Sequence, residues 1–196
     1  AVAVAFLLRE LGTAVVPGAS MQARRVEACG LAVCRTEELG QHLVIGQGRC
    51  VNAGAVVFHD EALLQHHGPD DDEAVFQMCV QALTDPWAQN RLWDLSVALK
   101  NIQQIELHIA GRVQRERPDL MSNVCPGRSL ASLVATISNH AQQTLIHSQP
   151  GGRGVFMVAS LMQHSCSPTC TFATNGKHQY VVAHRDLNEG DEVSIS

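Results

Sequence analysis

Residues 163–170 (QHSCSPTC) hold the densest cluster of chemically capable side chains in this sequence of 196 residues. They combine an amide and an imidazole with the two thiols of Cys166 and Cys170. Such groups can bind a polar ligand, ligate a metal or act as a nucleophile. A Cys-x-x-x-Cys pair without further Cys or His nearby is more often two buried thiols, and no oxyanion-hole motif accompanies a hydrolase built from Cys166 and His164. A metal centre and a cysteine hydrolase are therefore both disfavoured.

The residues on either side make this cluster specific. Residues 154–170 (GVFMVASLMQHSCSPTC) resemble the segment Gly-aromatic followed by Ser-Leu-Leu-Asn-His-Ser-Cys-x-Pro-Asn-Cys of SET-domain lysine methyltransferases, particularly the SET-and-MYND branch. Residues 185–196 (RDLNEGDEVSIS) are similar to the family's Arg-Asp-Ile-x-x-Gly-Glu-Glu-Leu-x-Ile. Alone, this second segment would indicate a strand and a turn, because Asn, Gly and Asp favour turns. Both motifs in the family's order predict a SET domain.

Weaker similarity covers the amino-terminal part. Residues 28–35 (ACGLAVCR) resemble the Gly-x-Gly-Leu-x-Ala-x-Arg opening of a SET domain without its first glycine, and residues 51–64 (VNAGAVVFHDEALL) resemble the Ile-x-x-Gly-Glu-x-Val that follows. We favour Gly30 at this position, which makes 36–49 an insertion. An alternative register uses Gly40 and loses the second glycine. A glycine here would let the backbone come close to a cofactor, since it has no Cβ.

The resemblance implies transfer of a methyl group from S-adenosylmethionine to a lysine of a protein substrate. In the family the Asn-His pair binds this cofactor, and Gln163 and His164 stand at those positions. Gln keeps the amide but places its polar atoms about 1.5 Å further out. Asn139 resembles the family's Asn-x-Phe element without its Phe, and a polar residue near a helix end is an equal alternative. The other cofactor positions that the resemblance assigns are Gly30, Leu31, Ser160 and Met162.

The implied reaction is an attack by a neutral lysine amine on the sulfonium methyl, which requires mainly alignment and deprotonation. The lysine pKa of about 10.4 would be lowered in an apolar tunnel beside a sulfonium. The family's best-known tyrosine would directly follow Ser196, so no catalytic residue is assigned and this chain itself is expected to be inactive. No metal is expected within these residues, and Cys166 would ligate zinc only together with cysteines beyond Ser196.

A SET-like binding module that does not methylate is the alternative, from another class of function. Three departures from the family favour it: Gln163 for Asn, Thr169 for the second Asn, and Ala28 for the first glycine. The MYND zinc finger, expected soon after Leu64, is absent. We favour the enzyme because the two carboxy-terminal motifs match together.

Composition limits the partners. The formal net charge of -5, without a Lys/Arg-rich run, argues against nucleic acid and suits a basic protein with an accessible lysine. Seven scattered cysteines indicate reduced thiols, hence the cytoplasm or the nucleus. Residues 1–8 are apolar but too short to span a bilayer and lack the basic residues of a signal peptide, so we expect no membrane partner.

These motifs require a fold to hold them, and the expected class is α+β: a SET-type, β-rich core of small curved sheets with a helical insertion. Short apolar runs between Gly and polar breaks predict strands. These runs fall at residues 31–33, 43–45, 55–58, 180–183 and 193–195.

The helical insertion is expected between the two groups of strands. Apolar positions three or four apart from 73 to 107, including Leu99, predict two helices interrupted at Pro86, the first capped by Asp72. A third helix is predicted from Ser129, its N-cap, to Leu145. One domain over 1–196 would then consist of an N-terminal half at 28–64, an insert at 72–147 and a C-terminal half at 150–196.

Overall fold

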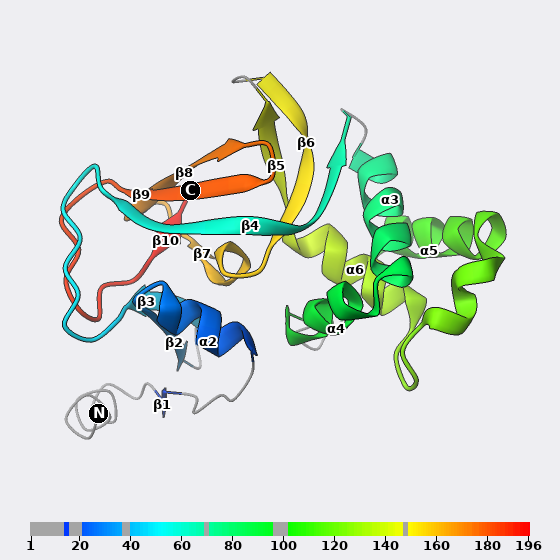
Figure 1. Ribbon diagram of the computed structural model, residues 1–196, viewed down its shortest axis with the longest axis horizontal. Coiled ribbons are helices and arrows are strands. Elements are labelled where there is room, and N and C mark those ends of the chain that lie inside the picture. The colour runs from blue at the N-terminus through cyan, green and yellow to red at the C-terminus, as the bar shows by residue number, and fades with distance from the viewer. Residues whose placement is uncertain (1–13, 16–20, 37–39, 69–70, 96–101, 147–148) are drawn as a thin grey trace. The chain divides into compact units, whose positions relative to one another are not determined.

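The structure is a computed structural model that describes residues 14–15, 21–36, 40–68, 71–95, 102–146 and 149–196. It forms two compact units (Figure 1). Of the described residues, the first unit comprises those within 14–60, 161–173 and 179–196, and the second comprises those within 61–160 and 174–178. The apolar segment 1–8 and Leu99 lie outside the described residues. The predicted single domain, with halves at 28–64 and 150–196 around an insert at 72–147, stays a prediction.

The first unit is made of small sheets. β1 (Ala14–Val15), β2 (Leu31–Thr36) and β3 (Gly40–Ile45) form an antiparallel sheet in that order, and α2 (Met21–Ala28) contacts β2. The segments of β4 (Val56–His67), β9 (His178–Ala183) and β8 (Cys170–Asn175) that belong to this unit are neighbours in that order. β7 (Gln163–His164) and β10 (Ser194–Ile195) form a short parallel pair. The predicted strands are confirmed, and β3 occupies much of the segment that was expected to be an insertion at 36–49.

Alternating side chains explain why these segments form strands. In β2, Cys34 is buried while the next residue, Arg35, is exposed. In β9, Val181 and Ala183 are buried, and Tyr180, which directly precedes Val181, is exposed. This two-residue period places one face of each strand in a core and the other in water.

The second unit contains helices and a hairpin. Its helices are α3 (Asp71–Thr84), α4 (Pro86–Leu95), α5 (Gln104–Glu116), the 3-10 helix η1 (Pro118–Asn123) and α6 (Leu130–His140). β5 (Ala141–Ile146) pairs with β6 (Gln149–Phe156), and β6 pairs in turn with residues 62–67 of β4, all antiparallel. The 3-10 helix η2 (Ala159–Leu161) follows β6. Mixed helices and antiparallel sheets confirm the α+β class.

Several predicted helix boundaries were wrong. The region 73–107 contains α3, α4 and the start of α5, rather than two helices. Pro86 begins α4, where its missing N–H is harmless, and the Asp85 carboxylate accepts from the Trp87 N–H at 2.9 Å. Asp72 lies inside α3, which begins at Asp71.

The predicted helix from Ser129 to Leu145 ends earlier. Ser129 is its N-cap as predicted, because the hydroxyl accepts from the Ser132 N–H at 3.0 Å. The helix stops at His140, and residues 141–146 form β5, whose backbone pairs with β6. Pairing with the next strand in the sequence thus overrides the apolar spacing that continues the helical pattern.

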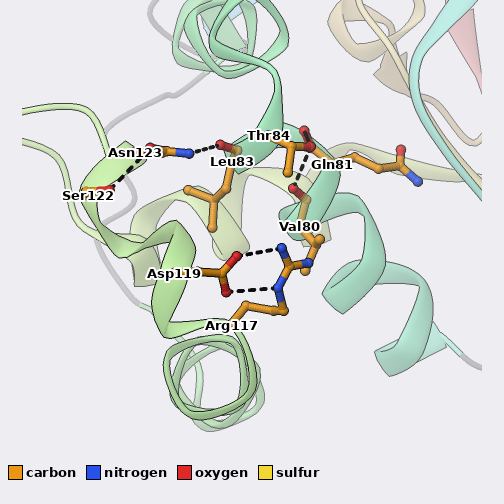
Figure 2. Close-up of polar contacts among 8 residues, drawn as sticks. All are labelled: Val80, Gln81, Leu83, Thr84, Arg117, Asp119, Ser122 and Asn123. Carbon is orange, nitrogen blue, oxygen red and sulfur yellow. Dashed lines mark hydrogen bonds and ion pairs between the residues drawn. The ribbon is translucent and has the colours of Figure 1, made fainter.

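Partly buried hydrogen bonds join the end of η1 to α3 and α4. Figure 2 shows the Asn123 amide donating to the Leu83 carbonyl at 2.9 Å, with the Arg117–Asp119 ion pair beside it. Gln89, which is 1% exposed, donates to the Asn123 carbonyl at 2.9 Å and accepts from the Cys125 N–H at 2.9 Å. These bonds satisfy buried backbone groups where the chain leaves the helices.

Apolar side chains of α3, α4, α5 and α6 form one core in the second unit with residues of β4 and β6. Leu83, Leu92, Val113, Leu133 and Ile137 are fully buried. Burying each such side chain stabilises a fold by about 1.5–3 kcal/mol. None of the described helices is long and apolar enough to cross a membrane.

Candidate functional site

The two carboxy-terminal motifs meet in the first unit. β7 carries Gln163 and His164, and β10 lies parallel to it with Ser194 opposite Gln163 and Ile195 opposite His164. The Ser165 N–H extends the pair by donating to the Ile195 carbonyl at 2.7 Å. The segment 161–170 and the segment 185–196 are therefore parts of one local structure.

The carboxy-terminal motif is also paired with β3. Val193 donates to the Leu43 carbonyl at 2.9 Å, and the Gly190 N–H donates to the Ile45 carbonyl at 2.9 Å. The Ile45 N–H donates to the Asp191 carbonyl at 2.9 Å. Residues 190–195 thus lie between β3 and β7, and each of their neighbours contributes backbone hydrogen bonds.

Acidic residues of the same motif hold turns. The Asp186 carboxylate accepts from the Ala53 N–H at 2.8 Å, and the Glu189 carboxylate accepts from the Gly48 N–H at 2.8 Å. Val51 and Leu187 exchange two backbone hydrogen bonds of 2.8 Å. The motif 185–196 therefore fixes the connection between β3 and β4 through specific polar contacts.

Gln163 has its side chain turned toward β3. Its amide nitrogen donates to the carbonyl of Gln41 at 2.8 Å. Gln41 directly follows Gly40, so this contact brings the motif to the glycine of the alternative register. The favoured Gly30 stands at the start of β2, one strand further from β7 in hydrogen-bonding order.

Gly30 has a local structural task. It ends the turn after α2 with a φ of +69°, and its carbonyl accepts from the Gly46 N–H at 3.0 Å. A Cβ at this position would lie 2.8 Å from the Arg49 side chain, whose guanidinium donates to the carbonyls of Cys29 and Val57. The turn and the packed arginine therefore account for the glycine, independently of a cofactor.

The remaining predicted residues fall in different environments. Leu31 is 2% exposed in the core of the first unit, and Met162 is also buried. His164 is exposed at the end of β7. Asn139 is exposed on α6, and its amide donates to the Ala135 carbonyl at 2.7 Å. This bond within the helix is what the helix-end interpretation of Asn139 predicts.

Ser160 has an unsatisfied hydroxyl. Its Oγ is shielded from solvent and has no hydrogen-bond partner among the described residues. A shielded hydroxyl without a partner destabilises a protein by roughly 1–3 kcal/mol unless a ligand or water supplies the bond. Ser160 lies in the part of the motif that belongs to the second unit, and its hydroxyl is available to a polar ligand there.

Sequence reasoning missed the principal polar contacts of Thr169. Its hydroxyl accepts from the Ser194 N–H at 2.9 Å and donates to the Glu192 carbonyl at 2.8 Å. Thr169 and Ser194 are 25 residues apart in sequence, so no local pattern announces their contact. The one available signal was the departure from the family's Asn at this position.

The thiols of the motif differ in exposure. Cys166 is exposed and Cys170 is buried, and burial raises the pKa of Cys170 above its ordinary value. Among the described residues, no group of three or more His, Cys, Asp or Glu side chains is arranged to hold a metal ion. A protonated Cys170 is a poor nucleophile at neutral pH.

The structure combines small antiparallel sheets, a short parallel pair of strands and a helical unit. The family that has this combination is identified from the sequence. The SET domain family model matches residues 48–196, so the chain belongs to the SET-domain family.

Particular relatives are similar over shorter stretches. The chain is 40% identical over 47 residues to the histone-lysine N-methyltransferase SMYD3 of Homo sapiens and 38% identical over 47 residues to that of Mus musculus. Each match covers 24% of this chain and 11% of the relative. Among solved structures, the SET domain of LSMT bound to lysine and AdoHcy matches with a TM-score of 0.54 and 11% identity, over 92% of this chain and 54% of that chain. At this identity the likeness shows the fold alone.

Proposed function

We propose that this SET domain transfers a methyl group from S-adenosylmethionine to a lysine side chain of a protein substrate. The observation that carries the proposal is the parallel pairing of β7 with β10, which joins the two motifs that the family uses. Membership of the SET family and the similarity to SMYD3, a histone-lysine N-methyltransferase, support the same reaction. The solved SET structure with lysine and AdoHcy supports a lysine substrate and this cofactor.

We propose that the cofactor is held mainly by the residues of β7 and by residues 160–162, which directly precede it. His164 and the backbone of β7 would bind it, and the shielded hydroxyl of Ser160 would gain the partner that it lacks in the described structure. Met162 would supply apolar contact, with Gly30, Leu31 and Asn139 as the further positions that the family resemblance assigns. The cofactor itself supplies an activated methyl group on a sulfonium.

The protein's contribution to the reaction would be alignment and desolvation of the lysine amine. An amine that leaves water beside a cation loses its proton more readily, so its pKa falls from about 10.4. The net charge of -5 would favour approach of a lysine-rich, basic protein. We place this substrate, and the enzyme, in the cytoplasm or the nucleus.

Methyl transfer can be tested with labelled S-adenosylmethionine and mixed cell proteins. The 196-residue chain and a version extended past the tyrosine expected after Ser196 are incubated in parallel. We expect labelled lysine only with the extended protein, because the tyrosine and following segment would wall the lysine tunnel. Equal, robust labelling by both would contradict this assignment of the catalytic wall.

A non-catalytic SET-like module is a second candidate, and the Gln163 side chain favours it. The amide that should face the cofactor is bonded to the Gln41 carbonyl at 2.8 Å. If calorimetry detects no binding of S-adenosylmethionine to the wild type but detects binding to Gln163→Asn, the position serves the cofactor and the natural protein is a degenerate module.

A further inference from the structure

Thr169 holds the carboxy-terminal segment through a hydroxyl that donates and accepts at once. Its Oγ1 accepts from the Ser194 N–H at 2.9 Å and donates to the Glu192 carbonyl at 2.8 Å. A further hydrogen bond runs in the opposite direction, because the Thr169 N–H donates to the Ser194 hydroxyl at 3.3 Å. Thr169 is 5% exposed and Ser194 is 2% exposed, so water cannot easily replace these bonds.

The segment that Thr169 holds is the one that supports the motif. β10 has two residues, and Ser194 is the residue opposite Gln163 in the parallel pair with β7. So short a pair specifies its own register poorly, and a slip of one residue would turn every side chain to the other face. The bonds from Thr169 hold the N–H of Ser194 and the carbonyl of Glu192, on either side of Val193. They add to the backbone bonds between residues 190–193 and β3 in keeping one register.

We propose that Thr169 is a positioning residue that sets the register of β10 on β7 and thereby places His164 and the backbone of β7 for the cofactor. The proposal rests on the proposed binding of S-adenosylmethionine. The two shortest hydrogen bonds of the Thr169 hydroxyl both go to the carboxy-terminal segment. Threonine can make both bonds with one oxygen because a hydroxyl is both donor and acceptor.

Three variants of the 196-residue chain test this role. Thr169→Val keeps the shape and removes the hydroxyl, Thr169→Ser keeps the hydroxyl, and Thr171→Val is the matched control at an exposed position of β8. S-adenosylmethionine is titrated calorimetrically at a temperature at which circular dichroism shows every variant to be folded. Amide hydrogen exchange of residues 187–196 is followed by mass spectrometry in the same samples.

We expect Thr169→Val to weaken binding about tenfold and to speed exchange in this segment, because it leaves a buried N–H and a carbonyl without their partner. Thr169→Ser should bind within about twofold of the wild type, since it retains the same donor and acceptor. Thr171→Val should change neither quantity. Faster exchange with loss of affinity, rescued by serine, is a signature that a general loss of stability would not give.

Two results would overturn the assignment, and they are distinguishable. Wild-type binding with an unchanged Kd in Thr169→Val shows that the threonine is merely structural, and the proposed function survives. No binding by the wild type defeats the proposed function and the positioning role with it. If Thr169→Val does not fold, Ser194→Ala is measured in its place, because it removes the acceptor of the Thr169 N–H. We expect it to bind about threefold more weakly, and an unchanged Kd would overturn the proposal.

Discussion

Replacing Gln163 by Asn separates the two tasks that this side chain could perform. In the structure its amide nitrogen lies 2.8 Å from the Gln41 carbonyl. Asn is shorter by one methylene, which withdraws the nitrogen by about 1.5 Å and takes it beyond hydrogen-bonding distance. The same change restores the residue that the SET family has at this position and frees its amide for the cofactor.

The two effects have opposite signs. A neutral hydrogen bond stabilises a fold by about 0.5–1.5 kcal/mol. The bond from Gln163 is exposed, so water can replace it at the Gln41 carbonyl. We therefore expect Gln163→Asn to lower the free energy of unfolding by about 0.5 kcal/mol. Affinity for S-adenosylmethionine should rise about tenfold, which corresponds to about 1.4 kcal/mol.

Urea denaturation and calorimetric titration measure the two quantities on the same preparation. Gln47→Asn makes the same chemical change at an exposed turn position and is the control. If Gln163→Asn loses stability and also binds the cofactor more weakly than the wild type, the glutamine is the better cofactor ligand. That result would refute the reasoning that its bond to Gln41 withholds it from the cofactor.

Three further predictions concern the surrounding fold. Asn123→Ala should lower the free energy of unfolding by about 1–3 kcal/mol in urea, because it leaves a backbone carbonyl of α3 without its donor. Burial lowers the pKa of His140, so below pH about 6.5 the unfolded chain binds a proton at this residue that the folded chain does not, and the free energy of unfolding falls. In acid denaturation curves, His140→Gln should make this fall less steep. Burial raises the pKa of Cys79 to about 12, so iodoacetamide should label the exposed Cys50 and Cys166 well before Cys79 in a mass-spectrometric time course.

Each of these has a contrary result. Unchanged stability of Asn123→Ala would mean that water replaces the amide at the α3 carbonyl. Equal slopes of stability against pH between pH 7 and 5 in the wild type and His140→Gln would show that another group carries the acid dependence. Labelling of Cys79 as fast as that of Cys166 in the folded protein would show that the core around α3 opens readily.

Local signals in the sequence predicted most of the elements, and they failed where pairing with another strand decides the structure of a segment. The strand at 43–45 and the cap at Ser129 are encoded by neighbouring residues, and both are confirmed. The residues of β5 continue the apolar spacing of α6, and only pairing with β6 makes them a strand. Helix α5 was missed as a separate element because the predicted pattern ended at residue 107, within its second turn.

The site shows the same division. The two family motifs singled out the segments around Gln163 and Ser194, and the structure pairs these segments with each other. The bond from Gln163 to Gln41 spans 122 residues, and its glutamine is the residue in which this chain departs from the family. The departure from the motif therefore marked Gln163 as unusual. The sequence did not predict that its longer side chain donates to the Gln41 carbonyl.

Whether the β7 segment binds S-adenosylmethionine is tested by direct titration of this cofactor into the wild-type chain and into Gln163→Asn. We expect saturable binding that S-adenosylhomocysteine displaces, weak in the wild type and about tenfold tighter in the variant. Absence of binding in both folded proteins would contradict the assignment of the β7 segment to this cofactor and, with it, the proposed methyl transfer.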